Sequence, residues 1–196
     1  MTEIQIECVE RWHSEPIANP FDELPRCEFE RLVCQQHEFN FRLWHEEDLA
    51  RNPDATDQRI ASVKRAIDGL NQRRNDLIES LDDLIGEILA AAGIERDPAL
   101  PINTETPGSA IDRLSIMSLR LYHYAEQLDR PEADGDHLAK VNQRILLCRD
   151  QHADLSQSLQ VLVDDLFAKR KQHKTYRQMK MYNDPSLNPE IYKASP

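Results

Sequence analysis

The chain has 196 residues, which is long enough for one domain with a substantial hydrophobic core and too short for two domains of ordinary size. It has only five glycines, and its frequent Leu, Ala, Glu, Gln, Arg and Asp are typical of helical bundles. Its formal net charge of −11 argues against general nucleic-acid binding, because phosphate contacts need a basic surface. The sequence therefore predicts an all-α protein that binds no nucleic acid.

The charge is unevenly distributed along the chain. Residues 169–196 carry seven Lys or Arg and two acids, so this segment has a net charge of +5 while residues 1–168 have −16. A basic segment beside an acidic body indicates docking within the molecule or onto a protein partner more often than polyanion binding. The chain shows no leader pattern at its N-terminus and no stretch suited to spanning a membrane. We expect a cytoplasmic protein with a protein partner or a homodimer.

Prolines divide the N-terminal part of the chain. Residues 1–24 combine a short amphipathic piece with Pro16 and Pro20, so we expect an N-terminal strap that packs on the rest of the protein. Proline is favourable in the first turn of a helix and disruptive further along it. A first helix is therefore predicted to begin near Pro25 and to end before Pro53.

A long second helix is predicted over residues 57–92. Its apolar residues recur every three or four positions and form one continuous seam: Ile60, Val63, Ile67, Leu70, Leu77, Leu81, Leu84 and Ile88. Arg74 also occupies this seam, and an unpaired buried guanidinium is very costly. We therefore predict a carboxylate or amide partner for it inside the protein. His123 and Gln36 are neutral candidates, and an acid from a partner subunit is the third alternative.

Two further helices are predicted in the second half of the chain. The third covers residues 109–129, with Ser109 as its N-cap and Asp112 completing an S-x-x-D capping box. The fourth covers about residues 136–171 and has the most regular apolar seam of the chain.

Together these elements predict an elongated, mostly antiparallel four-helix bundle over residues 25–172. Each of the two long helices would span about 54 Å at the usual helical rise. Residues 173–196 then form a basic tail that contains Tyr and Met side chains. We expect this tail to be extended and to pack on the bundle.

Polar residues of the first two helices form the candidate site. The turn between these helices is short, so they should be antiparallel neighbours, with the end of one level with the start of the other. The candidates are Glu47, Asp48, Arg51, Lys64, Asp68, Asn71 and Asn75. If the cluster binds a metal, the ligands are Glu47, Asp48 and Asp68, because hard divalent cations prefer carboxylate oxygens. No other cofactor is predicted, and the same acids could instead pair with neighbouring bases as part of the scaffold.

Four stretches, taken in order, resemble a bacterial family catalogued as domain of unknown function 4254. They are residues 43–51, 67–76, 107–116 and 180–189, and the resemblance spans about residues 25–192. It implies a bacterial cytoplasmic protein, and genes of the family often neighbour genes for lipopolysaccharide or other envelope glycans. The resemblance transfers no catalytic residue to this chain.

Two classes of function remain open from the sequence, and it does not decide whether the protein is an enzyme. The first is an interaction or accessory protein, since seams with polar interruptions are common where helical bundles associate. The alternative is a metal-dependent phosphoester or nucleotide hydrolase that uses the acidic cluster between the first two helices. The chain has no phosphate-binding loop and no nucleophile elbow. Converging side chains around a cleft would favour chemistry, and pairwise hydrogen bonds without a cavity would favour a scaffold.

Overall fold

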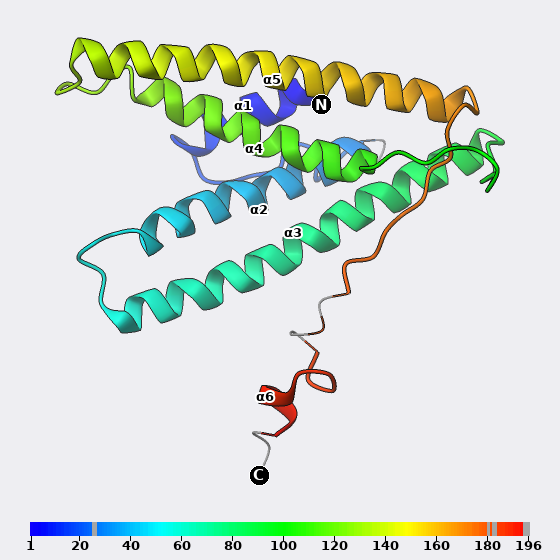
Figure 1. The fold of residues 1–196 in the computed structure, drawn as a ribbon, viewed down its shortest axis with the longest axis horizontal. Helices are drawn as coiled ribbons and strands as arrows, with labels where there is room; N and C mark the ends of the chain where they lie inside the picture. The colour runs from blue at the N-terminus through cyan, green and yellow to red at the C-terminus, as the bar shows by residue number, and fades with distance from the viewer. Residues whose placement is uncertain (25–26, 180, 182–183, 194–196) are drawn as a thin grey trace.

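The computed structural model describes residues 1–24, 27–179, 181 and 184–193, and its regular elements are helices throughout these ranges (Figure 1). This confirms the predicted all-α class. The helices are α1 Thr2–Trp12, α2 Glu28–Ala50, α3 Asp57–Ala91, α4 Pro107–Glu126, α5 Gly135–Phe167 and the short α6 Pro189–Tyr192. The predicted helix start at Pro25 and residues 180, 182 and 183 of the family-like stretch lie outside the described residues. None of the helices in the described part combines the length and apolarity needed to cross a membrane.

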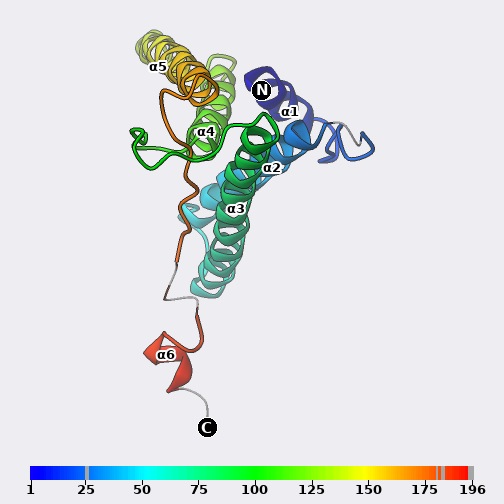
Figure 2. The ribbon, with the colours of Figure 1, turned by 90° about the vertical axis from the view of Figure 1, so that its right-hand side faces the viewer.

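Helix α4 is the centre of the arrangement, because it contacts α1, α2, α3 and α5. Helices α2 and α3 form one antiparallel pair, and α4 and α5 form another. The view in Figure 2 shows these pairs as two layers, with α1 lying beside α2 and α4. This arrangement confirms the predicted helical bundle and adds α1 to it, within the residues expected to form a strap.

Four apolar clusters form the core of the described chain, and the two with the most buried residues lie on either side of α2. The first lies where α1 meets α2 and α4, and it contains Cys8, Val9, Trp12, Cys34, Phe41 and Leu119. The second joins α2 and α3 to α4 and α5, and it contains Val33, Leu81, Ala110, Ile111, Leu114 and Leu159. In the predicted seam of α3, Val63 and Ile67 are buried, whereas Ile60 and Ile88 are each 41% exposed. Near the C-terminus of α3 it is Leu89, next to Ile88, that is buried, against Leu162 and Leu166 at the end of α5.

The start of α4 differs from the prediction. The helix begins at Pro107, and the Oγ1 of Thr106, rather than that of Ser109, accepts a hydrogen bond as the N-cap, from the Ser109 amide at 3.1 Å. Proline fits the first helical position because its fixed φ suits a helix and its missing N–H needs no partner there. Gly108 follows, and its amide donates a 2.7 Å hydrogen bond to the buried Asp82 carboxylate of α3. This contact fixes the approach of α4 to α3.

The end of α5 also differs from the prediction. The helix ends at Phe167 rather than near residue 171, because Lys169 adopts a φ of +55°, which is left-handed and ends the helix. The following residues run along α3 (Figure 1), where Arg177 forms ion pairs with Glu79 and Asp83. His173 Nε2 also lies 2.7 Å from the carbonyl oxygen of Asp82. Beyond them, α6 lies away from the bundle in both Figure 1 and Figure 2.

Candidate functional site

A buried carboxylate, Asp112 of α4, joins three helices in one hydrogen-bond network. It accepts hydrogen bonds from both Nε and Nη2 of Arg74 on α3, the first at 2.7 Å. From α2, Gln36 Nε2 donates to it at 2.5 Å and Asn40 Nδ2 at 3.0 Å. The hydrogen bond with Asp112 also holds the pKa of Arg74 above its usual value. The network therefore fixes the guanidinium of Arg74 and the amide of Asn40 in defined positions.

The expectation that Arg74 has an internal carboxylate partner is confirmed. That partner is Asp112 of the same chain, and the prediction that Asp112 completes a capping box with Ser109 is wrong. Gln36, one of the neutral candidates, binds the same carboxylate. His123 is not a partner of Arg74, because its side chain pairs with Glu126 on its own helix. The capping prediction failed because Thr106 and Pro107 start α4 two residues earlier, which frees Asp112 to face α3.

The network continues toward α1 through Ser115 and His37. Asn40 Nδ2 also donates to Ser115 Oγ at 2.9 Å, and His37 Nδ1 lies 2.7 Å from the same hydroxyl. The indole of Trp12 on α1 stacks on the His37 ring, with 5.3 Å between ring centroids. His37 and Ser115 are fully buried, so they position their neighbours rather than meet a ligand.

The buried His37 is expected to make the protein less stable in acid. Burial lowers the pKa of His37 to about 3, below its usual 6.5, so the ring stays neutral in the fold while the unfolded chain protonates. The free energy of unfolding should therefore fall as the pH drops from about 6.5 toward 3, with a slope from this group approaching roughly 1.4 kcal/mol per pH unit. Urea titrations of the wild type and His37→Gln at several pH values measure this slope. An identical slope in both proteins would contradict the assignment.

A cavity of about 330 Å³ opens where α2, α3 and α4 meet beside this network. Its polar lining comes from α2 and α3: Asn40, Glu47, Asp48, Arg51, Asn71 and Arg74. Its apolar lining is Leu43, Trp44, Ile116 and Leu119. Four of the predicted site residues, Glu47, Asp48, Arg51 and Asn71, are thus brought together around one space. The short turn between α2 and α3 brings the end of α2 beside α3, where Asn71 and Arg74 line the cavity in place of the Lys64 and Asp68 that the register pointed to.

The other predicted site residues lie elsewhere. Lys64 and Asp68 form an ion pair with each other on the exposed surface of α3. Asn75 is buried and does not line the cavity. Glu47, an expected metal ligand, forms an ion pair with Arg51 at 2.6 Å. In the described part of the chain, Glu47, Asp48 and Asp68 do not form a group whose oxygens could share one ion.

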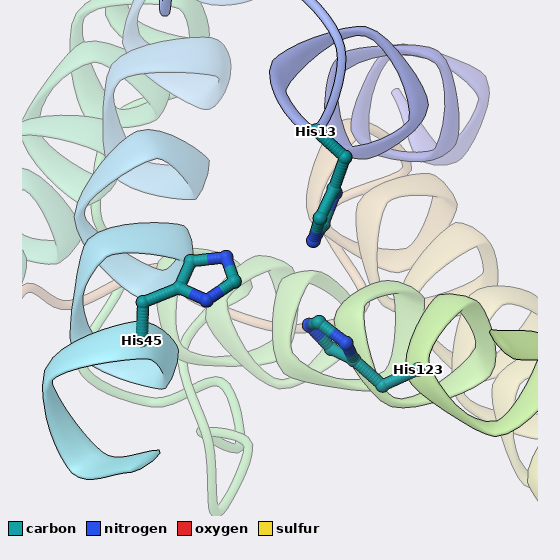
Figure 3. Close-up of side chains that lie close together, drawn as sticks. All are labelled: His13, His45 and His123. Atoms are coloured by element: carbon teal, nitrogen blue, oxygen red, sulfur yellow. The ribbon is translucent and has the colours of Figure 1, made fainter. Parts of the chain in front are cut away.

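The residues of the described chain that could hold a metal together are instead three histidines. His13 caps the C-terminus of α1, His45 belongs to α2 and His123 to α4, and they point toward one another in Figure 3. Their potential ligand nitrogens all lie within 4.8 Å of one another. No sequence pattern groups them, because each comes from a different helix and no two share a ligand spacing. Only the fold brings them together.

The profile of one known family matches most of the chain. This family is described as "Protein of unknown function (DUF4254)", and the match covers residues 30–175. No curated protein and no solved structure matches the chain. The matched region includes the Asp112 network and the cavity, together with His45 and His123 of the histidine group. The chain belongs to the DUF4254 family of proteins of unknown function.

Proposed function

We propose that the protein binds a small polar molecule in the cavity between α2, α3 and α4. The observation that carries this proposal is the convergence of Asp48, Arg51, Asn71 and Arg74 on one space of about 330 Å³. Small-molecule sites commonly occupy a few hundred cubic ångströms and combine an apolar wall with a few oriented polar groups. The Trp44, Leu43 and Leu119 side chains supply that wall here.

The chemistry of the lining indicates what kind of molecule would fit. The side chains of Asp48 and Asn71 make no hydrogen bond within the described part of the chain, so a carboxylate acceptor and a side-chain amide remain for a ligand. Arg74 uses Nε and Nη2 for Asp112 and keeps its third nitrogen for another acceptor. The hydroxyl groups of a ligand could bond to Asp48 and Asn71, and a phosphate or carboxylate group on the same ligand could accept from Arg74. The buried network already holds the side chains of Arg74 and Asn40 in place. Ligand binding would therefore cost less side-chain entropy than it would with free side chains.

A hydrolytic activity stays the alternative at this cavity. It would need a divalent cation on Glu47 and Asp48 without help from Asp68, which pairs with Lys64. A link to envelope glycan synthesis remains a prediction from the family resemblance alone, and a cytoplasmic location remains a prediction from that resemblance and from the sequence.

A role as an interaction or accessory protein is a second proposal, favoured by the C-terminal segment. This segment exposes large apolar side chains: Met179 (87%), Met181 (61%), Leu187 (49%), Ile191 (40%) and Tyr192 (50%). Exposed apolar side chains gathered in one segment are typical of surfaces that bind another protein.

The cavity is tested by a thermal-shift screen of nucleotides, sugar nucleotides and sugar phosphates. At least one compound is expected to raise the melting temperature of the wild type, because it binds the folded state only. Asn71→Ala and Asp48→Asn should each abolish most of that shift, since they remove groups that line the cavity. Lys64→Ala, on the exposed surface of the same helix as Asn71, is the control and should keep it. Shifts that persist in both cavity variants would place the ligand elsewhere and contradict the proposal.

A further inference from the structure

Three histidine side chains from three helices surround one point near the end of α1 (Figure 3). The ring centroids of His13, His45 and His123 are 5.0–5.6 Å apart. The rings meet at interplanar angles of 68–81°, so they converge edge to face rather than form a stack. This leaves the potential ligand nitrogens facing a shared space.

Hydrogen bonds fix the tautomers of two of these rings. His13 Nδ1 lies 2.6 Å from the carbonyl oxygen of Val9, which can only accept, so Nδ1 carries the proton. His123 Nδ1 likewise lies 2.6 Å from a carboxylate oxygen of Glu126 and donates to it. In the neutral form of each ring, Nε2 therefore carries the lone pair, and both Nε2 atoms are buried without a hydrogen-bond partner in the described part of the chain. A histidine that donates Nδ1–H to a carbonyl or carboxylate and offers Nε2 is the usual arrangement of a metal ligand.

Side-chain packing explains where the His13 and His123 rings lie. It does not explain why their Nε2 atoms are buried without a hydrogen-bond partner in the described chain. The His13 ring stacks on Tyr122 at 4.0 Å and the His123 ring on Trp44 at 4.6 Å, as apolar rings would. Aromatic side chains at these positions would make the same stacks without burying a lone pair. Unpaired buried acceptors are unfavourable, so two at the same place indicate an absent partner.

Negative charge next to the group also suits a cation. The acids that face the group, Glu126 beside His123 and Asp48 near His45, supply negative charge next to it. Imidazole ligands with acids behind them favour a divalent transition ion over magnesium or calcium, which prefer oxygen ligands.

We propose that His13, His45 and His123 bind one Zn²⁺ ion, which fastens α1 to α2 and α4. Imidazole nitrogens in a tetrahedral zinc site lie about 3.3 Å from one another, given Zn–N distances of about 2.0–2.1 Å. Small side-chain rotations bring nitrogens that lie within 4.8 Å to that spacing. Water or another small ligand completes the tetrahedron, since no fourth His, Cys, Asp or Glu of the described chain joins the group. This site lies beside the proposed ligand cavity, whose lining residues Trp44 and Asp48 adjoin it, but none of the three histidines lines that cavity.

Zinc binding to the purified full-length chain tests the proposal. After removal of metal with a chelator, titration with Zn²⁺ at pH 7.5 should give one ion per chain and a higher melting temperature. Substitution by Co²⁺ should give the visible absorption of a tetrahedral nitrogen site. His45→Gln should weaken Zn²⁺ binding by at least about 100-fold, because ligand loss costs more than the 10–100-fold typical of an outer partner. His45 suits this test, since its ring makes no hydrogen bond in the described chain that the variant would break.

Two further variants separate a metal site from a structural role. Glu126→Gln leaves the ligands in place and should weaken Zn²⁺ binding by about 10-fold, because Glu126 only orients His123. His152→Gln is the matched control, since His152 also has a buried, unpaired Nε2 but lies outside the group. It should bind Zn²⁺ within about twofold of the wild type. Fewer than one ion per chain, or wild-type affinity in His45→Gln, would overturn the proposal, as would equal weakening in His152→Gln.

Discussion

Replacing Gly108 by alanine is expected to lower the free energy of unfolding by about 3 kcal/mol, the range of severe overpacking. A Cβ at this position would lie 2.6 Å from the carbonyl oxygen of Ile78 and 2.8 Å from Asp82 Oδ1. The backbone of α3 cannot turn away as a flexible side chain could, so α4 must shift away from α3. That shift would also stretch the hydrogen bond from the Gly108 amide to Asp82. Urea-induced unfolding followed by circular dichroism measures the loss.

Gly69→Ala is the matched control for this prediction. Gly69 lies inside α3, and a Cβ there would meet no other atom within 4 Å. Alanine has the higher helix propensity, so this variant should gain about 0.5–1 kcal/mol. Similar stabilities for the two variants would show that α4 does not depend on close contact at Gly108.

Removing one member of the Arg74–Asp112 pair is expected to have an effect of similar size. Asp112→Leu leaves Arg74, Gln36 and Asn40 without their shared acceptor, and Arg74→Met leaves a buried carboxylate without its cation. Each single variant should lose about 3 kcal/mol, because a charge left unpaired in the interior carries its full desolvation cost.

The double variant Arg74→Met/Asp112→Leu should be more stable than the sum of the single losses predicts. With both charges gone, apolar side chains of similar volume fill the space, and such replacements are often close to neutral. The coupling energy from the double-mutant cycle is the measured quantity. Additive losses would mean that the two side chains do not depend on each other.

Much of the helical arrangement could be predicted from the sequence because it follows from local patterns. Proline positions and the three-and-four spacing of apolar residues placed α2 and α3 within a few residues of their observed ends. The start of α4 was misplaced because Thr106 and Ser109 are both good caps, and only the contact of Gly108 with α3 distinguishes them. The end of α5 was misplaced because a left-handed Lys169 leaves no pattern in the sequence.

Only the part of the candidate site that depends on how α2 lies against α3 could be predicted, because a short turn connects these two helices. Glu47, Asp48 and Arg51 could therefore be expected to face α3. The register pointed to Lys64 and Asp68 as their neighbours, whereas Asn71 and Arg74 line the cavity with them. Asp112 comes from a helix that a long connection separates from α3, so its pairing with Arg74 depends on how α4 packs. The three histidines are the extreme case, since their grouping requires α1, α2 and α4 to meet.

The most direct test of ligand binding between α2, α3 and α4 is a nuclear magnetic resonance titration of the side-chain amides. The compound identified by thermal shift should move the amide signals of Asn71 and Asn40, which line the cavity. It should leave unchanged the signal of Asn142, whose amide bonds to the Leu138 carbonyl on α5. Saturable shifts of Asn71 and Asn40 alone are the predicted result. Saturable binding that leaves both signals unmoved would contradict a ligand site in this cavity.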